Sequence, residues 1–154
     1  MQLKSLLAPL ALPTPILAAG KAVVVNNCPR EVSLWSVGSS VTPAPGPLAA
    51  RGGSYSETFS RDPVTGGKSL KITLARDGLF TGAPQLNFAY NLDGGQVWYD
   101  LSTVFGNAFA GSIIVVASRL GSCPQIVWGS GTNPGGSQVK VCTAEQDVVL
   151  TLCA

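Results

Sequence analysis

The sequence predicts an all-β domain, folded as a β-sandwich or a barrel. Roughly ten short strand-like segments recur along the chain, at intervals of about 8–15 residues. Turn signals rich in glycine separate them, and 18 glycines and 11 prolines among 154 residues favour turns over long helices. No segment has a convincing 3.6-residue periodicity of the kind that marks an amphipathic helix. Charged residues make up 12% and apolar residues 45%, which is the composition of a folded protein and not of a disordered one.

Each expected strand is either alternately apolar and polar, as in a half-buried strand, or continuously apolar, as in a strand covered on both faces. Between the strands, sequences such as Asp93-Gly94-Gly95 supply the positive-φ positions that tight turns need. We expect the Pro-rich segment 41–47 to be an exposed loop and residues 103–106 to form one short helical turn. The expected strands cover residues 22–26, 31–37, 54–60, 70–74, 85–90, 96–101, 112–118, 125–128, 137–142 and 147–153.

The first 19 residues have the order of a secretory signal peptide. Lys4 lies in a short positive start, residues 6–17 are mostly apolar, and small residues precede the expected cut between Ala18 and Gly20. The apolar stretch is shorter than the ~20 residues that span a bilayer, and no later segment is long enough. The sequence therefore predicts a secreted protein with a signal peptide at 1–19, one mature domain over residues 20–154, and no membrane association.

The composition excludes several classes of site. The chain contains no histidine, which excludes Ser-His-Asp and Cys-His catalysis as well as histidine-ligated zinc or copper. Ten basic residues against eight acidic ones give a net charge of +2, too balanced for a nucleic-acid-binding surface. We therefore expect no metal site, no cofactor and no nucleic-acid partner, and we expect a monomer.

Four cysteines, Cys28, Cys123, Cys142 and Cys153, predict two disulfides in a secreted chain. The sequence contains no Cys-X-X-Cys spacing that would support a metal site instead. Three pairings are possible, and the sequence alone does not choose among them. One of them closes a loop of about 20 residues between Cys123 and Cys142, worth roughly 3 kcal/mol from chain entropy, and leaves Cys28 for Cys153.

Several short motifs resemble those of a known family. The opening apolar strand, the Asn-Cys pair at Asn27-Cys28 and a second strand with Trp35 resemble the start of thaumatin-like proteins. The span 20–154 is similar to their small fungal relatives, the Blastomyces yeast-phase-specific protein family. The resemblance implies a thaumatin-like β-sandwich of about ten strands in which Cys28 pairs with Cys153, which leaves Cys123 for Cys142. The similar motifs are Asn26-Asn27-Cys28-Pro29, Arg61-Asp62-Pro63-Val64-Thr65-Gly66-Gly67, Asn91-Leu92-Asp93-Gly94, Cys123-Pro124-Gln125-Ile126-Val127-Trp128 and Leu150-Thr151-Leu152-Cys153.

The resemblance also implies a class of function. The small fungal proteins are secreted and associated with growth phase, whereas larger thaumatin-like proteins include antifungal proteins, β-1,3-glucan binders and some β-1,3-glucanases. The glucanase cleft holds an arginine and several carboxylates. Asp100 matches one of these carboxylates, but Phe105 and Asn87 stand where two others would be. Either Arg61 or Arg51 is a candidate for the arginine.

Glycoside hydrolysis normally requires two carboxyl groups, about 5 Å apart for retention and about 6.5–9.5 Å apart for inversion. The pair to test is Asp100 with either Glu57 or Asp62. Because two of the family's carboxylates are replaced, we assign no catalytic residue. Asp100, Glu57 and Asp62 remain candidates for an alternative function, that of a weak endo-β-1,3-glucanase or antifungal protein.

Binding a polysaccharide without hydrolysis requires an aromatic platform and a few polar groups. Trp98 and Tyr99 are adjacent on one expected strand, so their side chains point to opposite faces and only one can lie in the core. We expect the exposed member of this pair, with Asp100 and Arg61, to bind a ligand. The leading hypothesis is a non-enzymatic extracellular or cell-wall interaction protein that binds β-glucan or another cell-wall polysaccharide. A secreted effector or antigen that binds a host protein is the other alternative.

Overall fold

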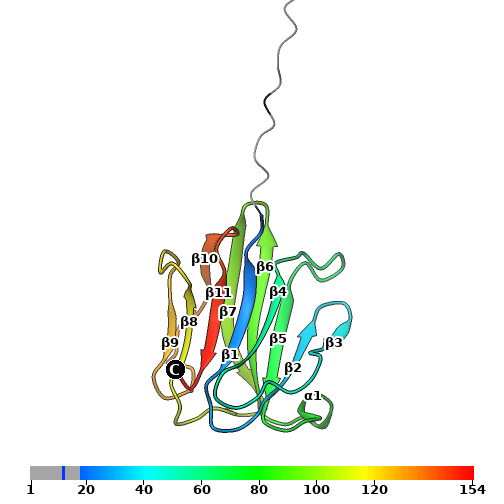
Figure 1. The fold of residues 1–154 in the computed structure, drawn as a ribbon, viewed down its shortest axis with the longest axis vertical. Coiled ribbons are helices and arrows are strands. Elements are labelled where there is room, and N and C mark those ends of the chain that lie inside the picture. Colours follow the sequence, from blue (N-terminus) through cyan, green and yellow to red (C-terminus); the bar gives the residue numbers. More distant parts are fainter. Residues whose placement is uncertain (1–11, 13–17) are drawn as a thin grey trace, which may run out of the picture.

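The chain folds into two β-sheets stacked face to face (Figure 1). The computed structural model describes residue 12 and residues 18–154. The expected signal peptide at residues 1–19 therefore lies almost entirely outside the described residues. Within the described residues, no helix has the length and the apolar character needed to cross a membrane.

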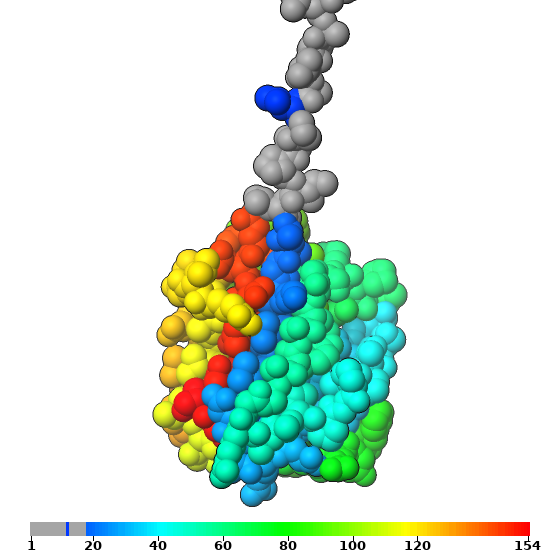
Figure 2. Space-filling model, in the orientation of Figure 1, coloured from blue at the N-terminus to red at the C-terminus, as the bar shows by residue number. Residues whose placement is uncertain are grey.

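The first sheet has five strands in the order β4-β1-β11-β8-β9. The strands β1 and β11, the first and last of the chain, pair in parallel, from Ala22 beside Val148 to Asn26 beside Leu152. The other pairs in this sheet are antiparallel. Figure 2 shows its outer face, with β1 in blue between β4 in teal and β11 in red. Its strands are β1 (Lys21–Asn26), β4 (Gly53–Thr58), β8 (Ile114–Ser118), β9 (Ile126–Trp128) and β11 (Val148–Leu152).

The second sheet has six strands in the order β10-β7-β6-β5-β2-β3, all antiparallel. A short helix, α1 (Gly78–Thr81), connects β5 to β6. The strands are β2 (Ser33–Val37), β3 (Val41–Pro43), β5 (Lys68–Thr73), β6 (Gln85–Asp93), β7 (Gln96–Val104) and β10 (Lys140–Thr143).

The core lies between the two sheets and is filled by side chains from both. Because successive side chains of a strand point to opposite faces, every second residue of each strand faces inward. In β11, for example, Val148, Leu150 and Leu152 are completely buried while Val149 and Thr151 are only partly so. The largest fully buried side chains are Trp128, Tyr99, Phe88, Leu70, Ile72, Leu86 and Leu101.

Two disulfides close the structure, in the pairing that the resemblance implied. Cys28 follows β1 and pairs with Cys153, which follows β11, so this bond joins the two ends of the parallel pair. Cys123 precedes β9 and pairs with Cys142 in β10, so the second bond links the edge strand of one sheet to the edge of the other.

All ten expected strands are present, with bounds shifted by up to three residues. An eleventh, β3, lies in the Pro-rich segment that was expected to be a loop; Pro43 is tolerated there because β3 is an edge strand that pairs only with β2. The helical turn expected over residues 103–106 is wrong, because β7 continues to Val104, opposite Gln85 of β6. The helix lies instead at Gly78–Thr81 and ends at Gly82, which has the left-handed conformation that favours glycine.

Candidate functional site: a groove on the six-stranded sheet

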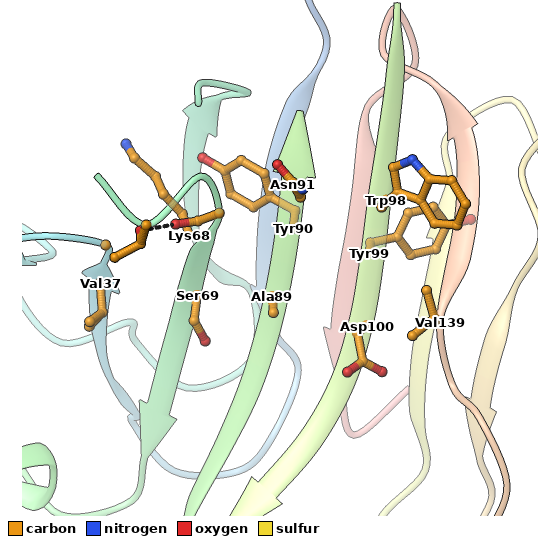
Figure 3. Close-up of a pocket in the computed structure, with 13 residues that line it drawn as sticks. Val37, Lys68, Ser69, Ala89, Tyr90, Asn91, Trp98, Tyr99, Asp100 and Val139 are labelled. Carbon is orange, nitrogen blue, oxygen red and sulfur yellow. Dashed lines mark hydrogen bonds between the residues drawn. The ribbon is translucent and has the colours of Figure 1, made fainter. Parts of the chain in front are cut away.

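The outer face of the six-stranded sheet carries a groove across its middle strands. The register places Val37, Ser69, Ala89 and Asp100 side by side in one row, from β2 through β5 and β6 to β7. Their neighbours Leu70, Phe88 and Leu101 along the same strands are buried in the core. The four residues of the row therefore face away from the core (Figure 3).

Small side chains on the floor make the hollow. Ser69 and Ala89 occupy adjacent positions in the row, and Gly67 immediately precedes β5, where any side chain would approach the Tyr90 carbonyl. Larger residues stand on both sides, including Val37 on one side and Trp98 on the other. The result is a groove of about 480 Å³. The buried hydroxyl of Ser69, on the floor of the groove, has no hydrogen-bond partner among the described residues.

The Trp98–Tyr99 pair divides between the surface and the core. Trp98 is 42% exposed and its indole ring forms part of the groove wall, beside Val139 (Figure 3). Tyr99 is 1% exposed, and its hydroxyl donates a hydrogen bond to the carbonyl of Pro124. Burial raises the pKa of Tyr99 above its ordinary value. The Tyr99 ring therefore belongs to the core, contrary to its place among the expected ligand-binding residues, and Trp98 is the aromatic surface that a ligand can reach.

Asp100 is the carboxylate in the groove. It lies two residues after Trp98 on the same face of β7, and its Oδ1 accepts a hydrogen bond from the Leu101 N–H at 2.8 Å. In the part of the chain that the structure describes, ion pairs join Arg76 to Glu31 and Arg119 to Asp147, and neither involves Asp100. Asp100 is therefore a partly exposed negative charge with no cation paired to it among the described residues.

Asp62 lies beside the groove, but both of its carboxylate oxygens already accept hydrogen bonds from the protein. Its Oδ1 accepts hydrogen bonds from the backbone N–H groups of Val64 and Thr65, and its Oδ2 accepts from the N–H and hydroxyl of Ser39, at 2.8–2.9 Å. These bonds hold the pKa of Asp62 well below its ordinary value. Asp62 is 5% exposed. It therefore fixes two turns at the groove's edge and has no free oxygen for catalysis, although it was one of the candidate catalytic residues.

Arg61 lies just outside the groove. It is exposed, and its guanidinium reaches to 3.6 Å from the place that a Cβ on Gly66 would occupy. Thr65 and Gly67 of the same loop line the groove, whereas Arg61 lies against the loop. Arg61 is thus near the expected ligand-binding surface without forming its wall.

Glu57 is on the other side of the six-stranded sheet from Asp100. Its two carboxylate oxygens accept hydrogen bonds from the hydroxyls of Tyr55, at 2.7 Å, and of Tyr90. Tyr90 points into the core, as does its cross-strand partner Tyr99, whereas Asp100 points outward. Burial, followed by the contact with Glu57, raises the pKa of both Tyr55 and Tyr90 above the ordinary value. The structure therefore does not bring Asp100 and Glu57 into one site.

Several groove residues were not predicted from the sequence. Lys68, Asn91 and Val139 line the groove with Trp98 and Asp100, but they come from three different strands or loops. The alternating pattern identified which residues of a strand share a face, but it gave no register between strands. Within the described residues, no cluster of three His, Cys, Asp or Glu side chains could hold a metal ion.

The comparisons with known proteins agree with the fold. The family described as Blastomyces yeast-phase-specific protein matches residues 9–154. The "Secreted thaumatin-like protein calA" of Emericella nidulans is 32% identical over 105 residues, which cover 68% of this chain and 57% of that protein. The chain thus spans little more than half the length of this relative. The "Antigenic thaumatin-like protein" of Arthroderma benhamiae is 30% identical over 144 residues, covering 88% of this chain and 71% of that protein.

A solved structure has the same architecture. The crystal structure of the protein elicitor MoHrip2 from Magnaporthe oryzae matches this chain with a TM-score of 0.70 and 25% sequence identity. The match covers 88% of this chain and 100% of that one.

Proposed function

The chain belongs to the Blastomyces yeast-phase-specific protein family, and on this basis we propose that it is an extracellular, non-enzymatic protein that binds a cell-wall polysaccharide such as β-glucan. Two features support an extracellular location. All four cysteines are disulfide-bonded, which is typical of proteins in oxidising compartments. The relatives from Emericella nidulans and Arthroderma benhamiae are named as secreted and antigenic proteins.

The observation behind the binding proposal is the exposed Trp98 ring on the wall of an open groove, with Asp100 and Asn91 beside it. The flat apolar face of a β-linked glucose unit can stack on an indole ring. The hydroxyl groups at the edge of the sugar can then bond to a carboxylate and a side-chain amide. The groove volume of about 480 Å³ is in the range of small-ligand sites, which is compatible with binding a short segment of a polysaccharide chain.

The positions of the carboxylates favour binding over hydrolysis. Hydrolysis normally needs two carboxyl groups flanking one glycosidic bond. Asp100 is in the groove, whereas Glu57 is bound to two tyrosines between the sheets and Asp62 accepts four hydrogen bonds. The glucanase alternative would therefore depend on Asp100 alone.

A pull-down assay tests the proposal. Purified protein is incubated with insoluble β-1,3-glucan, chitin and cellulose, and both its depletion from solution and the release of soluble sugar are measured. We expect depletion by at least one polymer with no sugar release, and we expect Trp98→Ala to reduce the affinity about tenfold or more, because it removes the aromatic platform.

The matched control is Val127→Ala, which truncates a side chain of similar exposure on the outer face of the other sheet. This variant should bind like the unmodified protein. Sugar release that is lost in Asp100→Asn would instead establish the enzyme. No depletion by any polymer would contradict the binding proposal.

A second candidate function is recognition by a protein of another organism. It is favoured by the similarity, over 88% of this chain, to the structure of the protein elicitor MoHrip2. The Trp98→Ala variant separates the two functions, because it should lose polysaccharide binding. If that variant still elicits a response from host tissue as strongly as the unmodified protein, the surface recognised by the host lies outside the groove.

A further inference from the structure

We propose that the groove prefers a cationic amino sugar, and that Trp98 and Asp100 together bind the protonated 2-amino group of a glucosamine unit, as found in deacetylated chitin. The inference rests on the proposed function, because it assumes that the groove binds a polysaccharide. It goes further by naming the chemical group that the site selects.

The first step is the uncompensated charge of Asp100. The carboxylate is partly exposed, and its one hydrogen bond to the described residues comes from the Leu101 N–H. Neither of the ion pairs in the described chain includes it. A carboxylate on the wall of an open groove with remaining acceptor positions is a binding point for an ammonium group.

The second step is the position of Trp98 relative to this charge. The two residues are two positions apart on one strand, so they face the same way with their Cα atoms about 7 Å apart. A single pyranose ring can therefore contact the indole face and present a ring substituent to the carboxylate. Tryptophan also attracts cations to its face more strongly than the other aromatic side chains do. Both residues thus favour a positively charged substituent over a neutral one.

The third step is the placement of the other charged groups. Lys68 lines the opposite side of the groove, and its side chain extends away from Trp98 and Asp100 (Figure 3). Lys71 faces outward one row further along β5 and donates a hydrogen bond to Asn87 Oδ1 at 3.2 Å, and burial lowers the pKa of this lysine. Arg61 lies outside the groove wall, and Asp93 is in the hairpin between β6 and β7. Of the two charged residues that line the groove, Lys68 and Asp100, Asp100 is the one on the same strand and face as Trp98.

Non-specific electrostatics would act against this preference. The chain has a net charge of +2, so a polycationic oligosaccharide is weakly repelled by the protein as a whole. A preference for the cationic sugar would therefore have to come from local contacts in the groove.

The experiment compares three oligosaccharides of equal length. Two of them differ only at the 2-amino group, and the third differs in both that substituent and the linkage. They are a β-1,4 hexamer of glucosamine, its N-acetylated form, and a β-1,3-glucose hexamer. Their affinities are measured by calorimetry at about pH 5, where aspartate is ionised and the amine is protonated. We expect the glucosamine hexamer to bind roughly three- to thirtyfold more tightly than its N-acetylated form.

Asp100→Asn keeps the shape and the acceptor for the Leu101 N–H but removes the charge, so it should reduce this ratio and leave only the contribution of Trp98. The control Asp93→Asn removes a carboxylate of the same type from the exposed hairpin and should leave the ratio unchanged. If the glucose hexamer binds and the glucosamine hexamer does not bind more tightly than its N-acetylated form, the amino-sugar inference is wrong and the proposed function stands. If none of the three binds, both are wrong.

Discussion

At the scale of single residues, Asp62 has a different role from the one that its type suggests. An aspartate beside a groove is a natural candidate for catalysis, but this one is buried and accepts four hydrogen bonds from two turns. There is also no room for a side chain on Gly38, because a Cβ there would collide with the Asp62 carboxylate. Asp62 therefore holds the edge of the groove in place.

This role predicts a dependence of stability on pH. The pKa of Asp62 is lower in the folded protein than in the unfolded chain, where it is near 3.9. Below that value the unfolded chain binds a proton that the folded state does not, so the stabilisation is present at neutral pH and is lost as the pH falls. Asp62→Asn should lower the melting temperature at pH 7, and its melting temperature should fall less steeply than that of the unmodified protein between about pH 5 and pH 2.

Asp77→Asn provides the comparison, because Asp77 is an exposed carboxylate before α1 whose side chain makes no capping hydrogen bond. The melting temperature of Asp77→Asn, measured by circular dichroism across this pH range, should change with pH in the same way as that of the unmodified protein. Parallel curves for Asp62→Asn and the unmodified protein would contradict the assigned role.

The sequence predicted some of the residues of the groove but not how their side chains are oriented. Alternation required Trp98 and Tyr99 to face opposite ways, but it could not decide which was exposed, because that depends on which face of the sheet is covered. It also could not separate Asp100 from Glu57, since each is a carboxylate on a strand. The difference between them comes from Tyr90, whose hydroxyl meets Glu57 only after the two sheets are packed.

At the scale of elements, the two disulfides have different functions. The bond between Cys28 and Cys153 closes a sequence separation of 125 residues, whereas the bond between Cys123 and Cys142 closes 19. The second bond anchors β10, an edge strand of four residues that pairs only with β7. Val139, which lines the groove beside Trp98, immediately precedes this strand.

Removing each disulfide should therefore affect different properties. Replacing Cys28 and Cys153 by alanine should lower the free energy of unfolding by about 5 kcal/mol, and replacing Cys123 and Cys142 by about 3 kcal/mol, because the longer loop restricts the unfolded chain more. Denaturant unfolding measures both values. Polysaccharide binding should fall further in the variant without Cys123 and Cys142, because β10 loses its anchor. Equal binding by both variants, at a temperature where both are folded, would contradict this assignment.

Ten of the strands could be predicted from the sequence, whereas β3 and α1 could not. Ten strands follow from alternation and glycine-rich turns, because these signals are local. The strand β3 was missed because Val41-Thr42-Pro43 has the composition of a loop, and it is a strand only because β2 offers a free edge. The helix α1 has four residues and no side-chain cap, so its sequence carries no start signal.

At the scale of the whole molecule, one core supports both sheets. The three tyrosines of the chain, Tyr55, Tyr90 and Tyr99, all point into or along this core, and burial raises the pKa of each. Glu57 adds to this effect for the first two. Ionisation of the tyrosines is therefore coupled to the loss of the fold.

We expect the folded protein to show almost no tyrosinate absorbance near pH 10, where tyrosine normally ionises. Above this pH the unfolded chain loses protons that the folded state retains, so stability falls as the pH rises. A spectrophotometric titration should show all three tyrosines ionising together with unfolding, whereas the same titration in denaturant should begin near pH 10. If a tyrosine ionises near pH 10 while the circular dichroism spectrum is still that of the folded protein, the predicted coupling between ionisation and unfolding is wrong.

The parallel pairing of β1 with β11 has a consequence for biosynthesis. The first strand leaves the ribosome early, but its parallel partner β11 is formed by residues 148–152. The five-stranded sheet cannot close until β11 has been synthesised, since β11 also separates β1 from β8. A nascent chain stalled before that point would expose the valines of β1 and the thiol of Cys28 without a partner, as long-range β pairings do during slow folding. Closure of this sheet thus waits for the synthesis of β11, and deletion of residues 148–152 would separate β1 and β4 from β8 and β9.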